Sequence, residues 1–142
     1  MNKLIEKPHF IFLVSIPIIM LMGIFNKATV LDINISDTYY VIDYLYLTIL
    51  ISMLFGLIGI GYWIMQKTNR KLSNRLNWIH TVLTLGGTLL IWILTKFYQT
   101  EIKEYEFNNN LTSSITLIIL LVILGQLIFP INIIYGLIKK KD

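Results

Sequence analysis

Four long apolar stretches constrain the fold of this chain more than any other feature. They cover residues 9–25, 41–65, 76–95 and 113–138. The last three match or exceed the roughly 20 residues that a helix needs to cross the hydrocarbon core of a bilayer. Each stretch must be helical, because backbone groups cannot stay unpaired in lipid. Only 14% of the residues are charged, against about 25% in soluble domains. We therefore expect an all-α, four-helix integral membrane bundle.

The first stretch is the shortest and follows Lys3 and Lys7, so a cleaved signal peptide is an alternative interpretation of it. No clear small-x-small cleavage site follows, and we expect the stretch to be retained as a span. The loops at 66–75 and 96–112 are too short to hold another folded domain. Residues 1–142 are therefore expected to form a single four-span membrane domain.

The distribution of basic residues predicts the orientation of the bundle. Nine Lys and Arg residues fall on one side of the four spans, whereas three, Lys27, Lys96 and Lys103, fall on the other. Both termini are therefore expected in the cytoplasm, and the bias suits a bacterial inner membrane. The net charge of +4 reflects this orientation. We do not expect nucleic-acid binding, which needs a basic face on a soluble domain.

Side chains that carry chemistry are sparse. Cysteine is absent, which excludes disulfides and thiolate metal sites. No Asp, Glu, Lys or Arg lies deep within a predicted span, although ion-coupled transporters generally place an ionisable residue there. Asp43, at the outer edge of the second span, is the nearest candidate. No Gly-x-Ser-x-Gly or His-Glu-x-x-His motif occurs. We therefore expect the chain not to be an enzyme.

Small residues and prolines predict how the helices pack. The spacing of Ser52, Gly56 and Gly59 puts them on one face of the second span, where small residues let membrane helices approach closely. The adjacent glycines at 86–87 predict a similar approach in the third span. Pro130 removes a backbone hydrogen bond and is expected to bend the fourth span.

Two polar side chains in the spans are interpreted as structural. Gln126, near the middle of the fourth span, is expected to form a helix-to-helix hydrogen bond, and a site on a transport path is the alternative. His80 begins the third span, and we expect it near the cytoplasmic interface, in an interfacial or structural role rather than as a ligand.

Residues 32–46 carry a motif. They read Asp-Ile-Asn-Ile-Ser-Asp-Thr-Tyr-Tyr-Val-Ile-Asp-Tyr-Leu-Tyr. The segment resembles a signature of haem-copper oxidase subunit I, His-Asp-Thr-Tyr-Tyr-Val-Val-Ala-His-Phe-His-Tyr, preceded by an Asp at the same spacing. Each histidine of the signature is replaced here, by Ser36, Tyr44 and Tyr46. In the length and order of its helices, the whole chain is similar to the last four of the family's twelve helices.

The resemblance implies where cofactors would bind. In the family, the two histidines of the tenth helix ligate two haems on opposite faces, and two residues advance about 200° around a helix. Tyr44 and Tyr46 hold these positions. A tyrosine can ligate ferric haem, but its unperturbed pKa near 10 makes the phenolate scarce. The family's other haem and copper ligands lie on helices that these four do not include. We therefore expect no cofactor, with haem as the alternative.

The same segment bears on metal binding and on the membrane boundary. Asp37 is the residue kept from the family's outer Mg²⁺ site, and Mg²⁺ usually needs several oxygen ligands or waters. Asp37 is instead expected to cap the second span together with Thr38. The tyrosines of this segment are interpreted as an interfacial aromatic belt; they are Tyr39, Tyr40, Tyr44 and Tyr46. The hydroxyls of Tyr39, Tyr40 and Tyr46 stand at helical spacings from Asp43 and are expected to satisfy its carboxylate.

These observations predict a small integral membrane protein without chemistry of its own. We expect a structural or interaction subunit of a respiratory or other membrane assembly, in contact with lipid and with other membrane subunits or copies of itself. A haem-binding electron-transfer protein that uses Tyr44 or Tyr46 is one alternative. A small-solute transporter that uses Asp43 and Gln126 is another.

Overall fold

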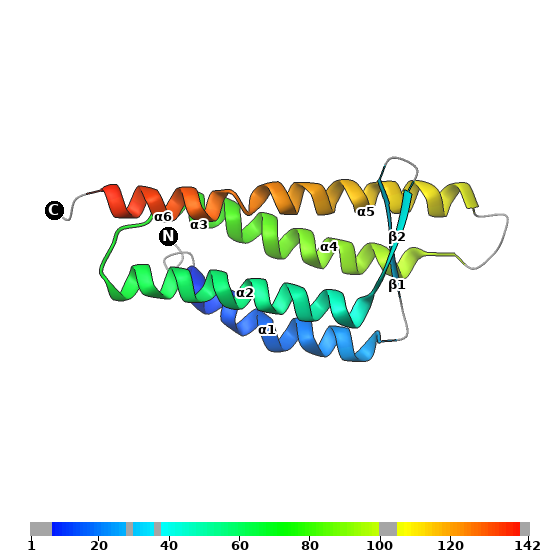
Figure 1. Ribbon diagram of the computed structural model, residues 1–142, viewed down its shortest axis with the longest axis horizontal. Coiled ribbons are helices and arrows are strands. Elements are labelled where there is room, and N and C mark those ends of the chain that lie inside the picture. Colours follow the sequence, from blue (N-terminus) through cyan, green and yellow to red (C-terminus); the bar gives the residue numbers. More distant parts are fainter. Residues whose placement is uncertain (1–6, 28–29, 36–37, 100–104, 140–142) are drawn as a thin grey trace.

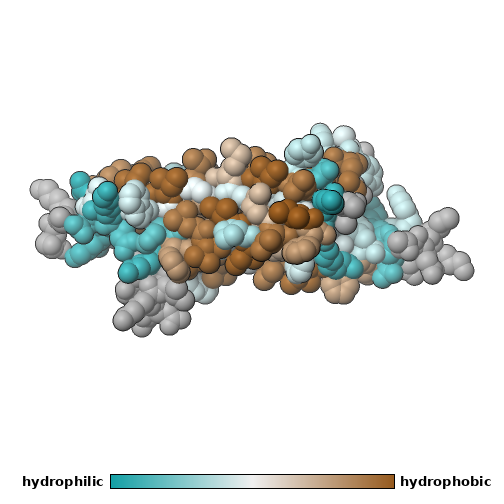
Figure 2. All heavy atoms as spheres, turned by 90° about the horizontal axis from the view of Figure 1, so that it is seen from below, coloured by the Kyte–Doolittle hydropathy of each residue, from teal (hydrophilic) through white to brown (hydrophobic). Residues whose placement is uncertain are grey.

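The computed structural model describes residues 7–27, 30–35, 38–99 and 105–139. These residues contain four antiparallel helical spans (Figure 1). All four are long and apolar enough to cross a membrane. Figure 2 shows a largely apolar middle and hydrophilic residues toward both ends of the face in view. The predicted four-helix membrane bundle is therefore confirmed. Helix α1 begins and α6 ends at the same end of the bundle, but the side of the membrane that this end faces stays a prediction.

The helices follow the predicted spans closely except at one boundary. The first two spans are α1 (Pro8–Phe25) and α2 (Tyr44–Lys67). The third combines α3 (Asn74–Thr81), the π-helical segment η1 (Val82–Gly86), α4 (Gly87–Leu94) and the 3₁₀ turn η2 (Thr95–Phe97). The fourth combines α5 (Tyr105–Gly125) and α6 (Ile128–Ile138). It starts eight residues before the predicted position 113, because its polar first turns extend the helix beyond the apolar stretch.

The fourth span is interrupted between α5 and α6, as Pro130 predicts. Pro130 lies in the first turn of α6, where a residue without a backbone N–H is tolerated. Around the interruption, the backbone N–H groups of Gln126 and Leu127 donate to carbonyls three residues earlier, at 3.0 and 3.1 Å.

A β-hairpin lies between α1 and α2, which an all-α prediction did not include. Strands β1 (Val30–Ile35) and β2 (Thr38–Asp43) pair antiparallel, with Val30 opposite Asp43. Leu31 and Ile33 point inward and pack with Leu111 of α5, whereas Val30 is exposed. Alternation of this kind is the mark of a half-buried strand. The hairpin lies at the end of the bundle opposite the one where α1 begins and α6 ends (Figure 1).

The predicted cap of α2 is wrong. The helix begins at Tyr44, and the Asp43 carboxylate accepts a hydrogen bond of 2.8 Å from the Leu45 backbone N–H, the usual role of an N-cap aspartate. Thr38 lies in β2 instead, and Asp37 is outside the described residues. The sequence interpretation placed the helix start several residues too early, since it did not foresee the strand.

Glycines let the helices pack closely, as their positions predict. A Cβ at Gly59 would lie 2.9 Å from the Leu13 side chain of α1, and one at Gly87 would collide with Val122 of α5. These contacts join the helices into two pairs, α1 with α2 and α4 with α5. Gly86 differs, because a Cβ there would meet nothing within 4 Å.

Candidate functional site: a polar core and an apolar cavity

An aromatic cluster joins the four spans toward the end of the bundle where α1 begins and α6 ends. Its rings are Phe12 of α1, Tyr62 of α2, His80 of α3 and Phe129 of α6. The His80 ring centroid lies 5.3 Å from that of Phe12 and 6.0 Å from that of Phe129. Tyr62 meets Phe129 edge to face at 5.0 Å, a geometry that aromatic pairs favour. Each span contributes at least one ring, since Phe55 of α2 also meets Phe12 edge to face at 5.3 Å. The cluster therefore fixes the relative positions of the spans.

His80 forms hydrogen bonds through both ring nitrogens. Nδ1 lies 2.9 Å from the Tyr62 hydroxyl, and Nε2 lies 3.3 Å from Oε1 of Gln126. A neutral imidazole protonated at Nε2 satisfies both bonds, because Nδ1 then accepts from Tyr62 and Nε2 donates to Gln126. His80 is fully buried inside the bundle, and its depth in the membrane stays a prediction. The structural interpretation of His80 agrees with this geometry.

Gln126 extends this network toward the middle of the bundle. Its side-chain amide nitrogen donates to the Thr84 hydroxyl at 3.1 Å and to the Val122 carbonyl at 2.8 Å. Its amide oxygen accepts from His80, so both amide hydrogens and the oxygen are engaged. The predicted helix-to-helix hydrogen bond of Gln126 is therefore confirmed.

A second polar contact ties α6 to the start of the third span. Asn132 is fully buried, and its side-chain nitrogen donates to Oδ1 of Asn77 at 2.6 Å. Its Oδ1 accepts from the Ser73 backbone N–H at 2.9 Å. Asparagine side chains that pair across helices replace bonds to water that are lost in the membrane. Polar side chains thus form a connected core at this end of the bundle.

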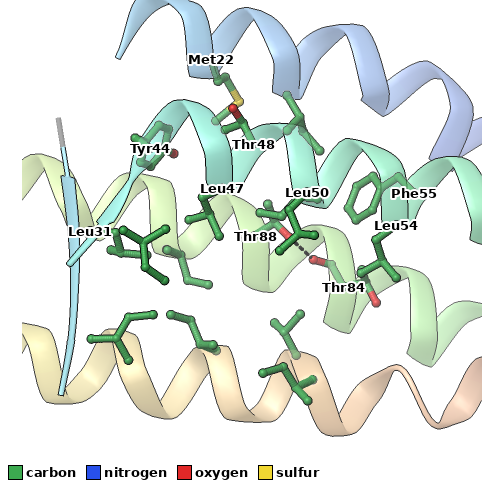
Figure 3. A pocket seen from close by; sticks show the side chains of 18 of the residues that line it. Met22, Leu31, Tyr44, Leu47, Thr48, Leu50, Leu54, Phe55, Thr84 and Thr88 are labelled. Carbon is green, nitrogen blue, oxygen red and sulfur yellow. Dashed lines mark hydrogen bonds between the residues drawn. The ribbon is translucent and has the colours of Figure 1, made fainter. Parts of the chain in front are cut away.

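An apolar cavity of about 330 Å³ occupies the centre of the bundle (Figure 3). One wall belongs to α1 and α2 and includes Ile19, Met22 and Ile51, whereas the opposite wall belongs to α4 and α5 and includes Ile91 and Ile119. The hairpin residues Leu31, Ile33 and Ile42 close one end, and Phe55, Thr84 and Gln126 lie toward the other.

The cavity is open on one side. The lining side chains Leu50, Leu54 and Ile123 are also exposed on the outside of the bundle, at 65%, 38% and 58%. The cavity therefore opens sideways, between α2 and α5.

Tyr44 and Tyr46, which stand where the resembling family has its haem-ligand histidines, lie on opposite faces of α2. Tyr44 is 5% exposed and lines the cavity beside the hairpin, whereas Tyr46 is 71% exposed. In the described part of the chain, the Tyr44 hydroxyl has no hydrogen-bond partner. Asp37, the predicted metal residue, lies outside that part. Among the described residues, no three His, Cys, Asp or Glu side chains come together as a metal site.

The predicted hydrogen bonds from the tyrosines to Asp43 do not form. Tyr39 and Tyr40 belong to strand β2, so the helical spacing assumed for them does not apply. The Tyr39 hydroxyl donates instead to Oδ1 of Asn109 at 3.2 Å. Both strand tyrosines are about half exposed.

Comparison with known proteins identifies the family. The family described as Cytochrome C and Quinol oxidase polypeptide I matches residues 4–98. That match covers the first three spans, the hairpin and the motif at 32–46. The chain belongs to this family.

Two curated relatives extend the comparison. Cytochrome c oxidase subunit 1 of Thermostichus vulcanus is 34% identical over 84 residues, which make up 58% of this chain and 15% of the relative. Cytochrome c oxidase subunit 1 of Corynebacterium diphtheriae is 30% identical over 108 residues, 72% of this chain and 19% of the relative. The chain thus spans less than a fifth of the length of these oxidase subunits. No solved structure matches it significantly.

The family match ends before α5, so the assignment of the fourth span to the family's last helix stays a prediction. Sequence reasoning also missed part of the polar core of this family member. Tyr62, Thr84, Asn77 and Asn132 were not singled out, although each is buried in a span. The polarity of these side chains was a usable sign of a buried contact, since a polar side chain in a membrane helix usually needs a hydrogen-bond partner.

Proposed function

We propose that this chain is a non-catalytic subunit of a membrane assembly in the bacterial inner membrane, with both termini in the cytoplasm. It would be a member of the oxidase polypeptide I family that supports neighbouring membrane helices without holding redox centres itself. One observation carries the proposal. The fully buried His80 spends both ring nitrogens on Tyr62 and Gln126 within the chain, so it serves to join helices.

The positions of possible iron ligands support a subunit without haem. Tyr44 and Met22 are the cavity-lining side chains that could ligate iron, and both come from the α1–α2 wall. The opposite wall, from α4 and α5, offers aliphatic side chains and the hydroxyls of Thr84 and Thr88. A haem held between two axial ligands needs a ligand on each face. The described residues therefore do not fit a six-coordinate haem in this cavity.

The alternative of a solute transporter has less support. Its two candidate residues are both engaged, because the Asp43 carboxylate caps α2 and the Gln126 amide bonds to three partners. Neither group is left to bind and release a polar solute without breaking contacts that hold the bundle together.

The outer surface supports association with other membrane proteins or with further copies of the chain. Large apolar side chains are exposed on every span, including Leu57 at 69% on α2 and Leu117 at 60% on α5. Lipid alone would satisfy such a surface, so the partner itself is the part of the proposal that needs a direct test. Because the family is described as cytochrome c and quinol oxidase polypeptide I, we propose an oxidase-containing respiratory assembly as the first place to seek the partner.

Crosslinking in native membranes tests the proposed role. The chain contains no cysteine, so a single cysteine at Leu57 or at Leu117 can carry a photoreactive crosslinker without background. We expect an adduct of fixed mass with a defined membrane protein from one of these positions and a different pattern from the other. If both positions yield only uncrosslinked monomer in native membranes, the proposed subunit role is wrong.

A further inference from the structure

We propose that the central cavity binds one hydrocarbon chain of a membrane lipid. In this proposal, the chain enters sideways between α2 and α5 and lies along α4, with its polar end beside Tyr44. The cavity then forms a defined lipid site inside the bundle, in addition to the lipid that surrounds any membrane protein.

The chemistry of the wall selects an uncharged, apolar occupant. None of the described residues that line the cavity is charged. Most are aliphatic, and the hydroxyls of Thr48 and Thr88 already donate to backbone carbonyls at 2.8 and 2.7 Å. A charged or strongly polar ligand would lose its bonds to water without replacement. A hydrocarbon chain makes no hydrogen bonds to water, so it loses none when it enters the cavity.

The volume suits a single chain. An engineered cavity of about 150 Å³ binds benzene, with its six carbons. On that scale, a cavity of about 330 Å³ holds roughly twelve or thirteen carbons. That is most of one acyl chain, and it is too little space for both chains of a phospholipid.

The lateral opening supplies the access. Leu50 and Leu54 of α2 and Ile123 of α5 line the cavity and are also exposed on the outside of the bundle. In a membrane-spanning bundle, this outside is hydrocarbon. A lipid chain can therefore pass between α2 and α5 without crossing a polar layer.

The two ends of the cavity differ in a way that orients the chain. At the hairpin end, the largely buried residue Tyr44 lines the cavity, and Figure 3 shows it where α2 begins. The Tyr44 hydroxyl has no hydrogen-bond partner among the described residues. An ester or hydroxyl oxygen there would satisfy it. At the other end, the Gln126 amide is fully hydrogen-bonded to protein, so it offers nothing to a polar group. The methyl end of the chain belongs there.

Lipid retention by the intact chain tests the proposal. The protein is reconstituted in vesicles of palmitoyl-oleoyl phosphatidylglycerol and then extracted into a sterol-based detergent, whose rigid rings do not mimic an acyl chain. Native mass spectrometry counts the phospholipids that remain. We expect one per chain. Wild-type protein that retains none overturns the proposal.

Variants that fill the cavity show where the lipid lies. Ile119→Phe fills it from α5, and Ile91→Phe fills it from α4. Leu117→Phe adds a ring on the exposed face of α5 and is the matched control. Each filled variant that keeps its helical circular dichroism should retain at least fivefold less lipid than the control. Equal retention by either folded filled variant and the control contradicts a lipid in the cavity.

The polar end is tested with two smaller probes. Dodecan-1-ol and dodecane have the same chain, and only the alcohol can bond to Tyr44. In delipidated wild-type protein, we expect the alcohol to raise the midpoint of thermal unfolding more than dodecane does, and we expect Tyr44→Phe to abolish that difference. A difference that persists in Tyr44→Phe shows that the chain is not oriented as proposed.

Discussion

Replacing His80 with phenylalanine should destabilise the bundle although the ring is kept. The substitution preserves a flat aromatic side chain between Phe12 and Phe129, but it removes the hydrogen bonds to Tyr62 and Gln126. His80→Phe therefore isolates the hydrogen-bonding contribution of His80. A smaller residue would remove the packing of the ring as well.

The size of the effect follows from these two bonds. Helix-to-helix hydrogen bonds in membrane proteins contribute about 0.6 kcal/mol on average and at most about 1.7 kcal/mol. Losing both should lower the free energy of unfolding by about 1–3 kcal/mol. His80→Ala also removes the ring, and truncation of a large buried side chain costs about 3–5 kcal/mol. We expect the order wild type, His80→Phe, His80→Ala in decreasing stability.

Unfolding by sodium dodecyl sulfate in mixed micelles, followed by circular dichroism, measures this order. The exposed Trp78 lies two residues away on the same helix, and Trp78→Phe should stay within about 0.5 kcal/mol of wild type. A double-mutant cycle with Tyr62→Phe should give a coupling energy of about 0.5–1.7 kcal/mol with His80→Phe. The reasoning is refuted if His80→Phe is as stable as Trp78→Phe and the coupling is zero.

Two further pairs of substitutions test the packing and the cap. Gly87→Ala should destabilise by about 1–3 kcal/mol, because its Cβ would collide with Val122, whereas Gly86→Ala should be neutral in the same unfolding assay; equal effects would contradict the close approach of α4 and α5. Asp43→Ala should cost about 1 kcal/mol, since the Leu45 N–H loses its acceptor, and Asp43→Asn should cost far less. Equal losses in the two Asp43 variants would point away from capping.

The membrane spans could be predicted from the sequence because their physical cause is local. Twenty apolar residues in lipid must form a helix, and the bounds of α1, α2 and the third span came within three residues. The hairpin was not predicted, because the tyrosines of the motif at 32–46 were assigned helical spacing. The alternation of Leu31, Ile33 and Ile35 with polar residues was a usable strand signal.

The candidate site was less predictable because it depends on distant residues meeting. Gln126 was expected to bond across helices, and it does. That its partner would be His80 depends on how the third and fourth spans align, which periodicity does not give. The cavity could not be predicted at all, since a void is set by the packing of several helices at once and leaves no mark in any single stretch.

A pyridine-haemochrome spectrum of the protein purified from its native membrane, with the haem quantified per chain, tests the central claim most directly. The account predicts no stoichiometric haem, because the positions of the family's ligand histidines are Tyr44 and Tyr46 and His80 is engaged within the bundle. One haem per chain would contradict it and would make Tyr44, which faces the cavity, the first residue to substitute.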